Sequence, residues 1–414
     1  MTELEKLADR ARKASREIAG LTEEKKNSAL RAVSDALRAS AQEILAANAE
    51  DMAAAERSGM SPAMLDRLKL TPERIESMAD GMDQVADLPD PTGKVLGRTV
   101  RPNGLVIEKV SVPLGVVGII YEARPNVTAD AAALCFKSGN AVLLRGGKEA
   151  VRSGAAISSV MRAALDRQGI PADCICFVED TTRESAKEMM GLVGRLDVLI
   201  PRGGAGLIRS VVENSRVPVI ETGVGICHVY VEKTADLGMA ASIIRNAKCS
   251  RPSVCNAAEC LIVDECIAQE FLPMAAAAMK DCGVQIRGDG KTCSVLPEAV
   301  PASAQDYDTE FLDYILAVRT VPGPDEAMEF IAQHGTGHSE AIVTRDEAVA
   351  DRFLRRVDAA AVYVNASTRF TDGGEFGLGA ELGISTQKLH ARGPMGLAEL
   401  TSTKYMIRGT GQIR

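Results

Sequence analysis

The chain has 414 residues, of which 46% are hydrophobic and 25% are charged, and this is the composition of a soluble globular protein with two or three domains. Because it contains no Trp and only 3% aromatic residues, it is poorly equipped for the base stacking on which single-stranded nucleic-acid binding relies. The net charge of -8 also argues against a surface that binds duplex DNA.

The amino-terminal segment is charged throughout, reading MTELEKLADRARKASREIAG, and has no apolar signal core. No stretch of the sequence approaches the ~20 apolar residues that span a bilayer, so we expect a cytoplasmic protein. The ten Cys residues lack the paired spacing of metal ligands, and the four His residues follow no ligand pattern. We therefore predict free thiols and no metal site.

Residues 1 to about 90 predict helices, because apolar side chains recur at three- and four-residue steps. The clearest series is Leu30, Val33, Leu37, Ala41 and Ile44. The period then changes in GRTVRPNGLVIEKVSVP, where a Pro-Asn-Gly turn separates two extended runs. This pattern predicts a β-hairpin near residues 96–113.

From residue 115 onward, short apolar runs alternate with helical segments. The strand candidates are GVVGII, AVLL, CICFV, LDVLI and VPVI. A second series follows, with a helix over 236–249, the strand AECLIV, a helix over 264–281, and the strands SEAIVT and AAVYV. Strands that alternate with helices predict an α/β fold with two domains, each built on a parallel sheet covered on both faces.

Two glycine-containing turns follow predicted strands. The first is Arg145-Gly146-Gly147-Lys148, and the second places Gly203, Gly204 and Gly206 at a helix amino terminus. Such turns bind anionic ligands at the carboxyl end of open α/β sheets, although each is also compatible with a plain tight turn. Neither is the dinucleotide fingerprint, but two of them in one sheet favour a bound nucleotide.

The segment RNAKCSRPSVCNAAECLIV contains three Cys residues. Cys260 falls in a predicted strand and Cys266 in the helix after it, so we expect both in the core, whereas Cys249 ends a helix. Cys255 lies in the loop, where nearby cations (Arg245, Lys248 and Arg251) would favour a thiolate. Its position is compatible with a catalytic nucleophile or with a small packing residue.

Several segments, read in order, carry a family resemblance. They include YEARPNVTADAAALCFKSGNAVLLRGGKEA, VPVIETGVGICHVYVE, NAKCSRPSVCNAAECLIV, EFLDYILAVRTV, HGTGHSEAIVT and DGGEFGLGAELGISTQKLHARGPMGLAELTSTKY. Together they resemble the aldehyde dehydrogenase superfamily, and more closely its gamma-glutamyl phosphate reductase branch, over nearly the whole chain. The most specific parts are RPSVCNA, YEARPNV and LLRGGKEA.

The resemblance implies two Rossmann-like α/β domains and a small β element for oligomerisation. An NADPH-binding domain would comprise 1–95, 114–230 and 355–384, and a catalytic domain 231–354. The oligomerisation element would comprise 96–113 and 385–414, because edge strands of this kind are usually covered by a partner. We therefore expect a homo-oligomer.

The resemblance also implies the reaction, which is reduction of L-glutamyl 5-phosphate to L-glutamate 5-semialdehyde in proline biosynthesis. Cys255 matches the nucleophile, which would expel phosphate and form a thioacyl enzyme. Asn126 matches the side-chain donor to the oxyanion, with the backbone N–H of Cys255 as the second donor. From its position alone, Asn126 also fits a helix N-cap.

The remaining site residues follow from the same resemblance. Lys148 stands where NAD-preferring relatives carry a glutamate, which favours NADPH, and Arg145 matches a lysine of the same turn. Glu310 resembles the glutamate that holds the nicotinamide ribose, although EFLD departs from the usual E-x-F-G-P. Arg124 and Arg251 are candidates for binding the substrate's carboxylate or phosphate.

Glu221 aligns with the general base of oxidising relatives. Water activation would waste the acyl phosphate here, and ETGVG departs from the usual E-L-G-G-K, so its catalytic role stays open. Two alternatives also stay open, namely a reductase of an acyl-CoA or another acyl phosphate, and a non-catalytic nucleotide-binding protein. The presence of Cys255 and Asn126 weighs against the non-catalytic protein. The resemblance further implies functional coupling to glutamate 5-kinase, which produces the acyl phosphate.

Overall fold

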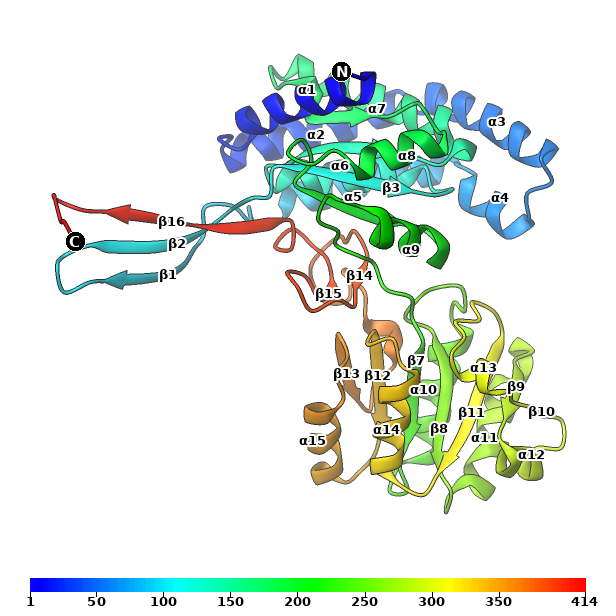
Figure 1. Cartoon of the computed structure of the whole chain (residues 1–414). Helices are drawn as coiled ribbons and strands as arrows, with labels where there is room; N and C mark the ends of the chain where they lie inside the picture. The colour runs from blue at the N-terminus through cyan, green and yellow to red at the C-terminus, as the bar shows by residue number, and fades with distance from the viewer. The chain divides into compact units, whose positions relative to one another are not determined.

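The computed structural model describes the backbone of all 414 residues and every side chain except those of Pro62 and Ala63. The chain forms two compact units (Figure 1). The first comprises Met1–Thr222, Gly377–Gly383 and Met395–Arg414, and the second comprises Gly223–Phe376 and Ile384–Pro394.

The first unit begins with the predicted helices, namely α1 (Glu3–Ile18), α2 (Glu23–Ala39), α3 (Ala41–Arg57), α4 (Pro62–Leu68) and α5 (Pro72–Asp87). The hydroxyls of Thr2, Thr22 and Thr71 cap α1, α2 and α5 by accepting backbone N–H groups of the first turn. The predicted apolar series is buried, apart from Ala41, which is partly exposed.

A four-stranded parallel sheet in the order β5-β4-β3-β6 forms the centre of this unit. Its strands are β3 (Val116–Tyr121), β4 (Ala141–Arg145), β5 (Ile175–Phe177) and β6 (Val198–Arg202), and its connecting helices are η1 (Lys148–Ala150), η2 (Ala172–Cys174), α6 (Asn126–Lys137), α7 (Val151–Arg167), α8 (Arg183–Met190) and α9 (Ala205–Asn214). Every residue of β3 and β4 is buried, as expected for strands covered on both faces. The predicted strand VPVI makes only the isolated bridge Leu199↔Val219, because Pro218 has no N–H to extend the ladder.

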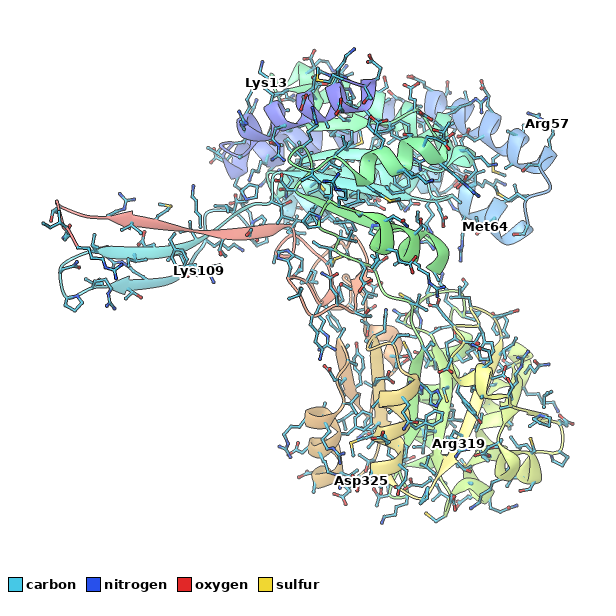
Figure 2. All side chains as sticks on the ribbon, viewed as in Figure 1. Lys13, Arg57, Met64, Lys109, Arg319 and Asp325 are labelled. Atoms are coloured by element: carbon cyan, nitrogen blue, oxygen red, sulfur yellow. The ribbon has the colours of Figure 1, made fainter. Side chains whose placement is uncertain are left out.

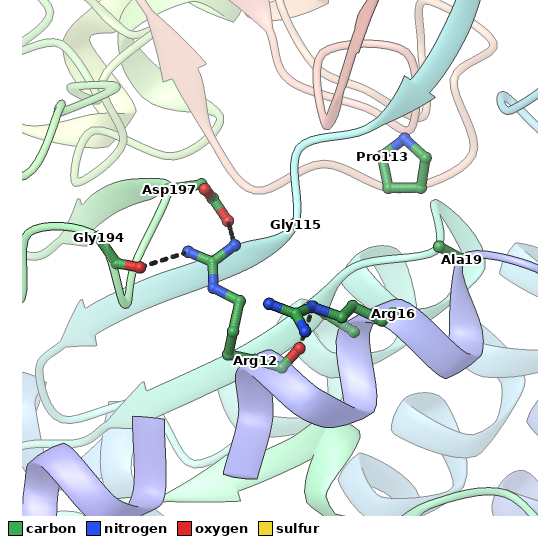
Figure 3. A pocket seen from close by; sticks show the side chains of 8 residues that line it. Arg12, Arg16, Ala19, Pro113, Gly115, Gly194 and Asp197 are labelled. Carbon is green, nitrogen blue, oxygen red and sulfur yellow. Dashed lines mark hydrogen bonds and ion pairs between the residues drawn. The ribbon is translucent and has the colours of Figure 1, made fainter. Parts of the chain in front are cut away.

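A cavity of about 500 Å³ lies beside α1 (Figure 3). Arg12 and Asp197 pair across its wall at 2.6 Å, and Asp197 also accepts the backbone N–H of Val116. Gly115 has φ +126, and a Cβ there would lie 2.1 Å from the Asp197 carboxylate. The cavity therefore adjoins the amino ends of β3 and β6, whereas the predicted cofactor residues follow the carboxyl ends of the strands.

The predicted hairpin is confirmed as β1 (Val95–Val100) and β2 (Val106–Pro113), and β16 (Thr401–Arg408) adds a third antiparallel strand. We call these three strands the ribbon. Its face alternates charged and apolar side chains, with Lys109 of β2 opposite Tyr405 of β16 (Figures 1 and 2). All six residues of β1 are exposed.

The second unit contains a seven-stranded parallel sheet in the order β10-β9-β11-β8-β7-β12-β13. The strands are β7 (Cys227–Val231), β8 (Ala258–Asp264), β9 (Gln285–Gly288), β10 (Val300–Pro301), β11 (Ile315–Val321), β12 (Ser339–Val343) and β13 (Ala361–Val364). The helices are α10 (Leu237–Cys249), α11 (Ala268–Met279), η3 (Lys280–Cys282), α12 (Gly290–Val295), α13 (Ala304–Tyr307), α14 (Pro324–His334), α15 (Glu347–Arg356) and η4 (Thr368–Phe370), and a small pair is formed by β14 (Ile384–Ser385) and β15 (Gly393–Pro394).

Alternate residues of the central strands enter two separate cores. Val229 and Val231 pack with α10 and α11, whereas Tyr230 packs with α14 and α15. Leu261 and Ile262 of the neighbouring strand divide in the same way. This alternation confirms a sheet that is covered on both faces.

Three expectations differ from the structure. The segment 355–384 was placed with the first domain, but β13 pairs in parallel with β12, and most of the segment therefore lies in the second unit. The second unit also begins earlier than residue 231, because β7 belongs to its sheet. Cys266, expected in the core, is exposed because it lies in the turn before α11. Among the described residues, no helix combines the length and the apolar character that a membrane crossing requires.

Candidate active site

The loop that carries Cys255 joins α10 to β8, and two residues of the second unit touch its backbone. A Cβ on Gly225 would lie 1.6 Å from the carbonyl oxygen of Cys255, so only glycine fits there. The thiol of Cys227 donates to the same oxygen at 3.2 Å. Burial raises the pKa of Cys227 well above its usual range, so this group stays a neutral donor.

Asn256, the next residue along the loop, is held by the η4 segment. Its Nδ2 donates to the carbonyl of Thr371 at 2.9 Å, and the hydroxyl of Thr368 donates to the Asn256 carbonyl at 2.8 Å. Asn256 and Thr368 are both buried. The loop around Cys255 is thus fixed on both sides of the thiol, while Cys255 itself keeps partial exposure.

Two of the three cations that the sequence suggested near Cys255 are paired with carboxylates. Arg245 pairs with Asp281 at 2.7 Å, and Lys248 forms a buried pair with Glu259 at 2.6 Å. Burial raises the pKa of Glu259 to about 7, against the opposing charge of Lys248. These two cations are therefore compensated by their own carboxylates. Arg251 is exposed at the start of the loop.

Glu310 lies beside the same loop. Its carboxylate accepts the backbone N–H of Gly225 at 2.8 Å, and Gly225 in turn lies against Cys255. Burial raises the pKa of Glu310, whereas the Gly225 N–H and the charge of Lys248 oppose that rise. Glu310, which is distant in sequence from Arg251 and Cys255, thus belongs to the same region of the second unit.

The other thiols of the segment lie in unreactive environments. Cys260 is buried in β8, and burial raises its pKa well above the usual range. Cys249 ends α10, as expected, and its pKa is raised to about 12, first by burial and then by its contact with Cys282. Since the thiolate is the nucleophilic form, neither residue is favoured as a nucleophile.

Asn126 is the first residue of α6 in the first unit. The N-cap is Pro125, so the sequence alternative that made Asn126 the cap is wrong. The exposed Asn126 amide donates from Nδ2 to the carboxylate of Asp130, one turn further on, at 3.0 Å. Burial raises the pKa of Asp130 to about 6, although the Asn126 donor and the charge of Arg202 lower it.

Arg124 and the Arg145 turn lie at the carboxyl ends of the neighbouring strands β3 and β4. The carboxylate of Glu149 accepts the backbone N–H of Ala123 at 2.7 Å and lies under Gly147, where a Cβ would lie 2.2 Å from it. Ala123 has φ +37, a backbone conformation that is rare outside glycine, and it precedes Arg124. Glu149 therefore links the segment before Asn126, through Ala123, to the turn that contains Arg145 and Gly147.

Within the turn, Arg145 is buried and Lys148 is exposed. Arg145 donates from Nη2 to the carbonyl of Thr182 at 2.6 Å, and burial lowers its pKa. Gly146 lies against the ring of Tyr121, where a Cβ would approach within 3.4 Å. The turn thus has one buried cation, Arg145, and one exposed cation, Lys148.

The amino terminus of α9 does hold an anion, but it is one of the protein's own carboxylates. Gly204 donates its N–H to Glu122 at 2.9 Å, and a Cβ on Gly203 would lie 2.4 Å from the same carboxylate. A ligand anion at this terminus would have to displace or share Glu122. Glu221 lies where the chain leaves this unit, next to Thr222, whose hydroxyl donates to the Pro201 carbonyl.

The predicted residues therefore fall into two sets, one in each unit. Among the described residues, no group of three or more His, Cys, Asp or Glu side chains is arranged to hold a metal ion. Sequence reasoning missed Gly225, Asp130 and Arg369. Asp130 lies four residues after Asn126 on a helix, a spacing that could have indicated contact. Arg369 reaches the Cys255 loop only through the fold of η4.

Comparison with known proteins shows which family the chain matches. The family model described as "Aldehyde dehydrogenase family" matches residues 1–294. The "Gamma-glutamyl phosphate reductase" of Carboxydothermus hydrogenoformans is 61% identical over 414 residues, which cover 100% of both chains. The protein of the same name from Heliobacterium modesticaldum is 58% identical over 100% of this chain and 99% of its own.

Solved structures agree with these matches. The crystal structure of gamma-glutamyl phosphate reductase from Thermotoga maritima has a TM-score of 0.98 and 47% identity, and covers 100% of both chains. An acetylating aldehyde dehydrogenase from Geobacillus thermoglucosidasius has a TM-score of 0.71 at 19% identity, over 100% of this chain and 97% of its own. The second likeness supports the fold alone.

Proposed function

The chain belongs to the aldehyde dehydrogenase family, in its gamma-glutamyl phosphate reductase group, and from this premise we propose that it reduces L-glutamyl 5-phosphate to L-glutamate 5-semialdehyde with NADPH and releases phosphate. This reaction belongs to proline biosynthesis. The observation that carries the proposal is the Cys255 loop, which is fixed by Gly225, Cys227 and Asn256 around a partly exposed thiol.

Cys255 is the nucleophile. Its thiolate forms a C–S bond to the acyl carbon, and the bond from that carbon to the phosphate oxygen breaks, so that phosphate leaves with the electron pair. Asn126 donates from Nδ2 to the oxyanion, and the Cys255 backbone N–H is the second donor. Each such donor is typically worth about 3 kcal/mol in the transition state.

The turns of the first unit provide groups that fit a dinucleotide. Arg145 is 7% exposed, and among the described residues its buried Nε has no hydrogen-bond partner, which points to an acceptor that a ligand would bring. Arg145, Gly146, Gly147 and Lys148 would hold the adenosine phosphate, with Gly203 and Gly204 near the diphosphate. Glu310 would hold the nicotinamide ribose. When bound, the reduced nucleotide supplies the hydride.

Substrate anions would be bound by Arg124 and Arg251. Glu221 has no required task in this scheme, because the thioester passes to hydride or back to phosphate and not to water. Since acyl phosphates hydrolyse readily, coupling to the glutamate 5-kinase that supplies the substrate would be advantageous. We further propose that the ribbon assembles the chain into a homo-oligomer.

The test is the reverse reaction, in which NADPH formation is followed from semialdehyde, NADP⁺ and phosphate. The wild type should require all three compounds. Cys255→Ala should lose at least about 10³-fold in turnover, whereas the matched control Cys260→Ala should retain activity if it folds. Appreciable turnover by purified Cys255→Ala protein would remove the nucleophile assignment.

A further inference from the structure

Arg369, in the η4 helix of the second unit, reaches both ends of the loop that carries Cys255. Its Nε donates to the hydroxyl of Ser250 at 3.1 Å, and its Nη1 donates to the side-chain oxygen of Asn256. Ser250 precedes the loop, and Asn256 directly follows Cys255. The guanidinium is therefore held in one place beside the proposed nucleophile.

A second cation accompanies Arg369. Burial lowers the pKa of Arg369, and the positive charge of Arg251 lowers it further, whereas the charges of Asp372 and of Cys255 raise it. Arg251 and Arg369 thus lie close enough to repel one another. Arg369 is partly buried and Arg251 is exposed, and an anion bound between two such cations would relieve their repulsion.

Asp372 acts on Arg369 through its charge, but among the described residues it forms no ion pair with either cation. Its Oδ1 accepts the backbone N–H of Gly374 at 2.9 Å and that of Glu375 at 3.4 Å. Arg245 and Lys248, in contrast, each have a carboxylate partner within 2.7 Å. The loop therefore combines two compensated cations with two that lack a bound carboxylate among the described residues.

We propose that Arg369, together with Arg251, binds the phosphoryl group of the substrate next to Cys255 and so selects an acyl phosphate over other activated acyl groups. This inference rests on the proposed function and adds to it a specificity-determining residue. A guanidinium suits the task, because its planar donors bind phosphate oxygens at two points.

The pair would act in both directions. In the forward direction, negative charge grows on the phosphate as the bond from the acyl carbon to its oxygen breaks, and the two cations stabilise that charge. In the reverse direction, a phosphate oxygen attacks the thioacyl carbon, and the C–S bond breaks with its electron pair returning to Cys255. The cations hold the attacking phosphate in place.

The experiment measures the dependence of the reverse reaction on inorganic phosphate. Arg369→Met should raise the KM for phosphate at least about tenfold, with changes of less than about threefold in the KM for semialdehyde and for NADP⁺. Arg369→Lys keeps the charge but loses the two-point geometry and should give a smaller increase. In rapid mixing without phosphate, the first-turnover burst of NADPH should stay within about threefold of the wild type, because that step precedes phosphate attack.

Thr368→Val is the matched control, because it weakens the hold on Asn256 without removing a cation. It should lower kcat and leave the KM for phosphate unchanged. If Arg369→Met lowers kcat and leaves the KM for phosphate unchanged, as expected for Thr368→Val, Arg369 only positions the loop and the inference is overturned. If Arg369→Met does not fold, Arg369→Lys decides, and a wild-type KM for phosphate in that variant would overturn the inference as well. A wild type that forms NADPH without any need for phosphate would instead contradict the proposed function.

Discussion

We propose that cofactor preference depends on the side chain at position 148, in the turn after β4. Lys148 is exposed there, beside the buried Arg145. Lys148→Glu should reduce the preference for NADPH over NADH at least about tenfold, because a phosphate-binding cation is lost and a repelling carboxylate is gained. The kcat/KM ratio for the two nucleotides measures the effect. Lys187→Glu, on α8, is a control for the change in net charge.

We propose that Asp130 orients the Asn126 amide toward the oxyanion. The ionised carboxylate accepts Nδ2–H of Asn126 at 3.0 Å, which leaves the second Nδ2–H for the substrate. Because the pKa of Asp130 is raised to about 6, the forward kcat should fall as pH decreases through that value. Asp130→Asn keeps a neutral acceptor at every pH, and its pH–rate profile should lack this decrease.

The contribution of Asp130 to the free energy of unfolding should depend on pH in the direction opposite to that of kcat. Asp130 binds its proton more tightly in the folded chain, at a pKa of about 6, than at the ordinary value of 3.8. Its contribution to stability is therefore lost as pH rises from about 4 to about 6. Asp130→Asn should be at least as stable as the wild type at pH 7, measured by urea unfolding. A variant that loses stability at pH 7 and keeps the low-pH decrease in rate would show that Asp130 is merely structural.

At single positions, the sequence predicted the place of a residue along the chain better than its environment. It placed Cys255 in the loop before β8, as the structure has it, because loop position is a local property. It assigned the surrounding charge to Arg245 and Lys248, whose carboxylate partners Asp281 and Glu259 appear only in the folded chain. Arg369 was missed for the same reason, since its contact with the loop is long-range.

The loop that follows α10 depends on the segment that precedes β7. A Cβ on Gly225 would lie 1.6 Å from the Cys255 carbonyl oxygen, and the Gly225 N–H also binds Glu310. Gly225→Ala must push the loop aside, and a displacement of ~1 Å can lower kcat about 100-fold. In the control Gly290→Ala, the new Cβ meets nothing within 4 Å. Turnover and thermal unfolding should be measured for both, and a wild-type kcat in Gly225→Ala would show that this contact does not position Cys255.

Helices and most buried strands were predictable from periodicity, but three segments that a proline or a polar residue interrupts were not. VPVI was expected to be a strand and makes one bridge, because Pro218 interrupts the ladder. β7 and β11 were not among the candidates, although CHVYV and ILAVRTV form central strands. Their polar residues, His228 and Arg319, interrupt the apolar runs. His228 is accommodated because it binds Glu340 at 2.9 Å within the core.

Domain boundaries were the least predictable feature of the chain. The return segment was assigned to the first domain, yet β13 pairs with β12 in the second unit. The sequence of β13, which has only four residues, does not indicate which sheet the strand joins, because register and partner are set by long-range packing. The pairing of β16 with β2, in contrast, agrees with the expected association of the hairpin with the carboxyl-terminal segment.

The ribbon has the properties of an assembly surface. It has only three strands, and large apolar side chains such as Leu96, Tyr405 and Ile407 are 57%, 64% and 60% exposed. Ile407 lies opposite Ile107 on β2, and Tyr405 lies opposite Lys109 on the same face, so exposed apolar side chains gather there beside one cation. A small sheet with exposed apolar residues and two open edges gains stability from a partner, and a second copy of this chain is the partner that we propose.

Ile407→Lys places a charge on that face and should weaken assembly, because burying an unpaired ammonium is costly. Sedimentation velocity should give a wild-type mass well above the 43.9 kDa of one chain, and a shift toward 43.9 kDa in the variant. Leu354→Lys is the control, since Leu354 is 45% exposed on α15, outside the ribbon, and its replacement should leave the mass unchanged. Circular dichroism would establish that both variants are folded. A wild type that sediments as a single chain, or an Ile407→Lys variant that assembles as the wild type does, would show that the ribbon is not the assembly surface.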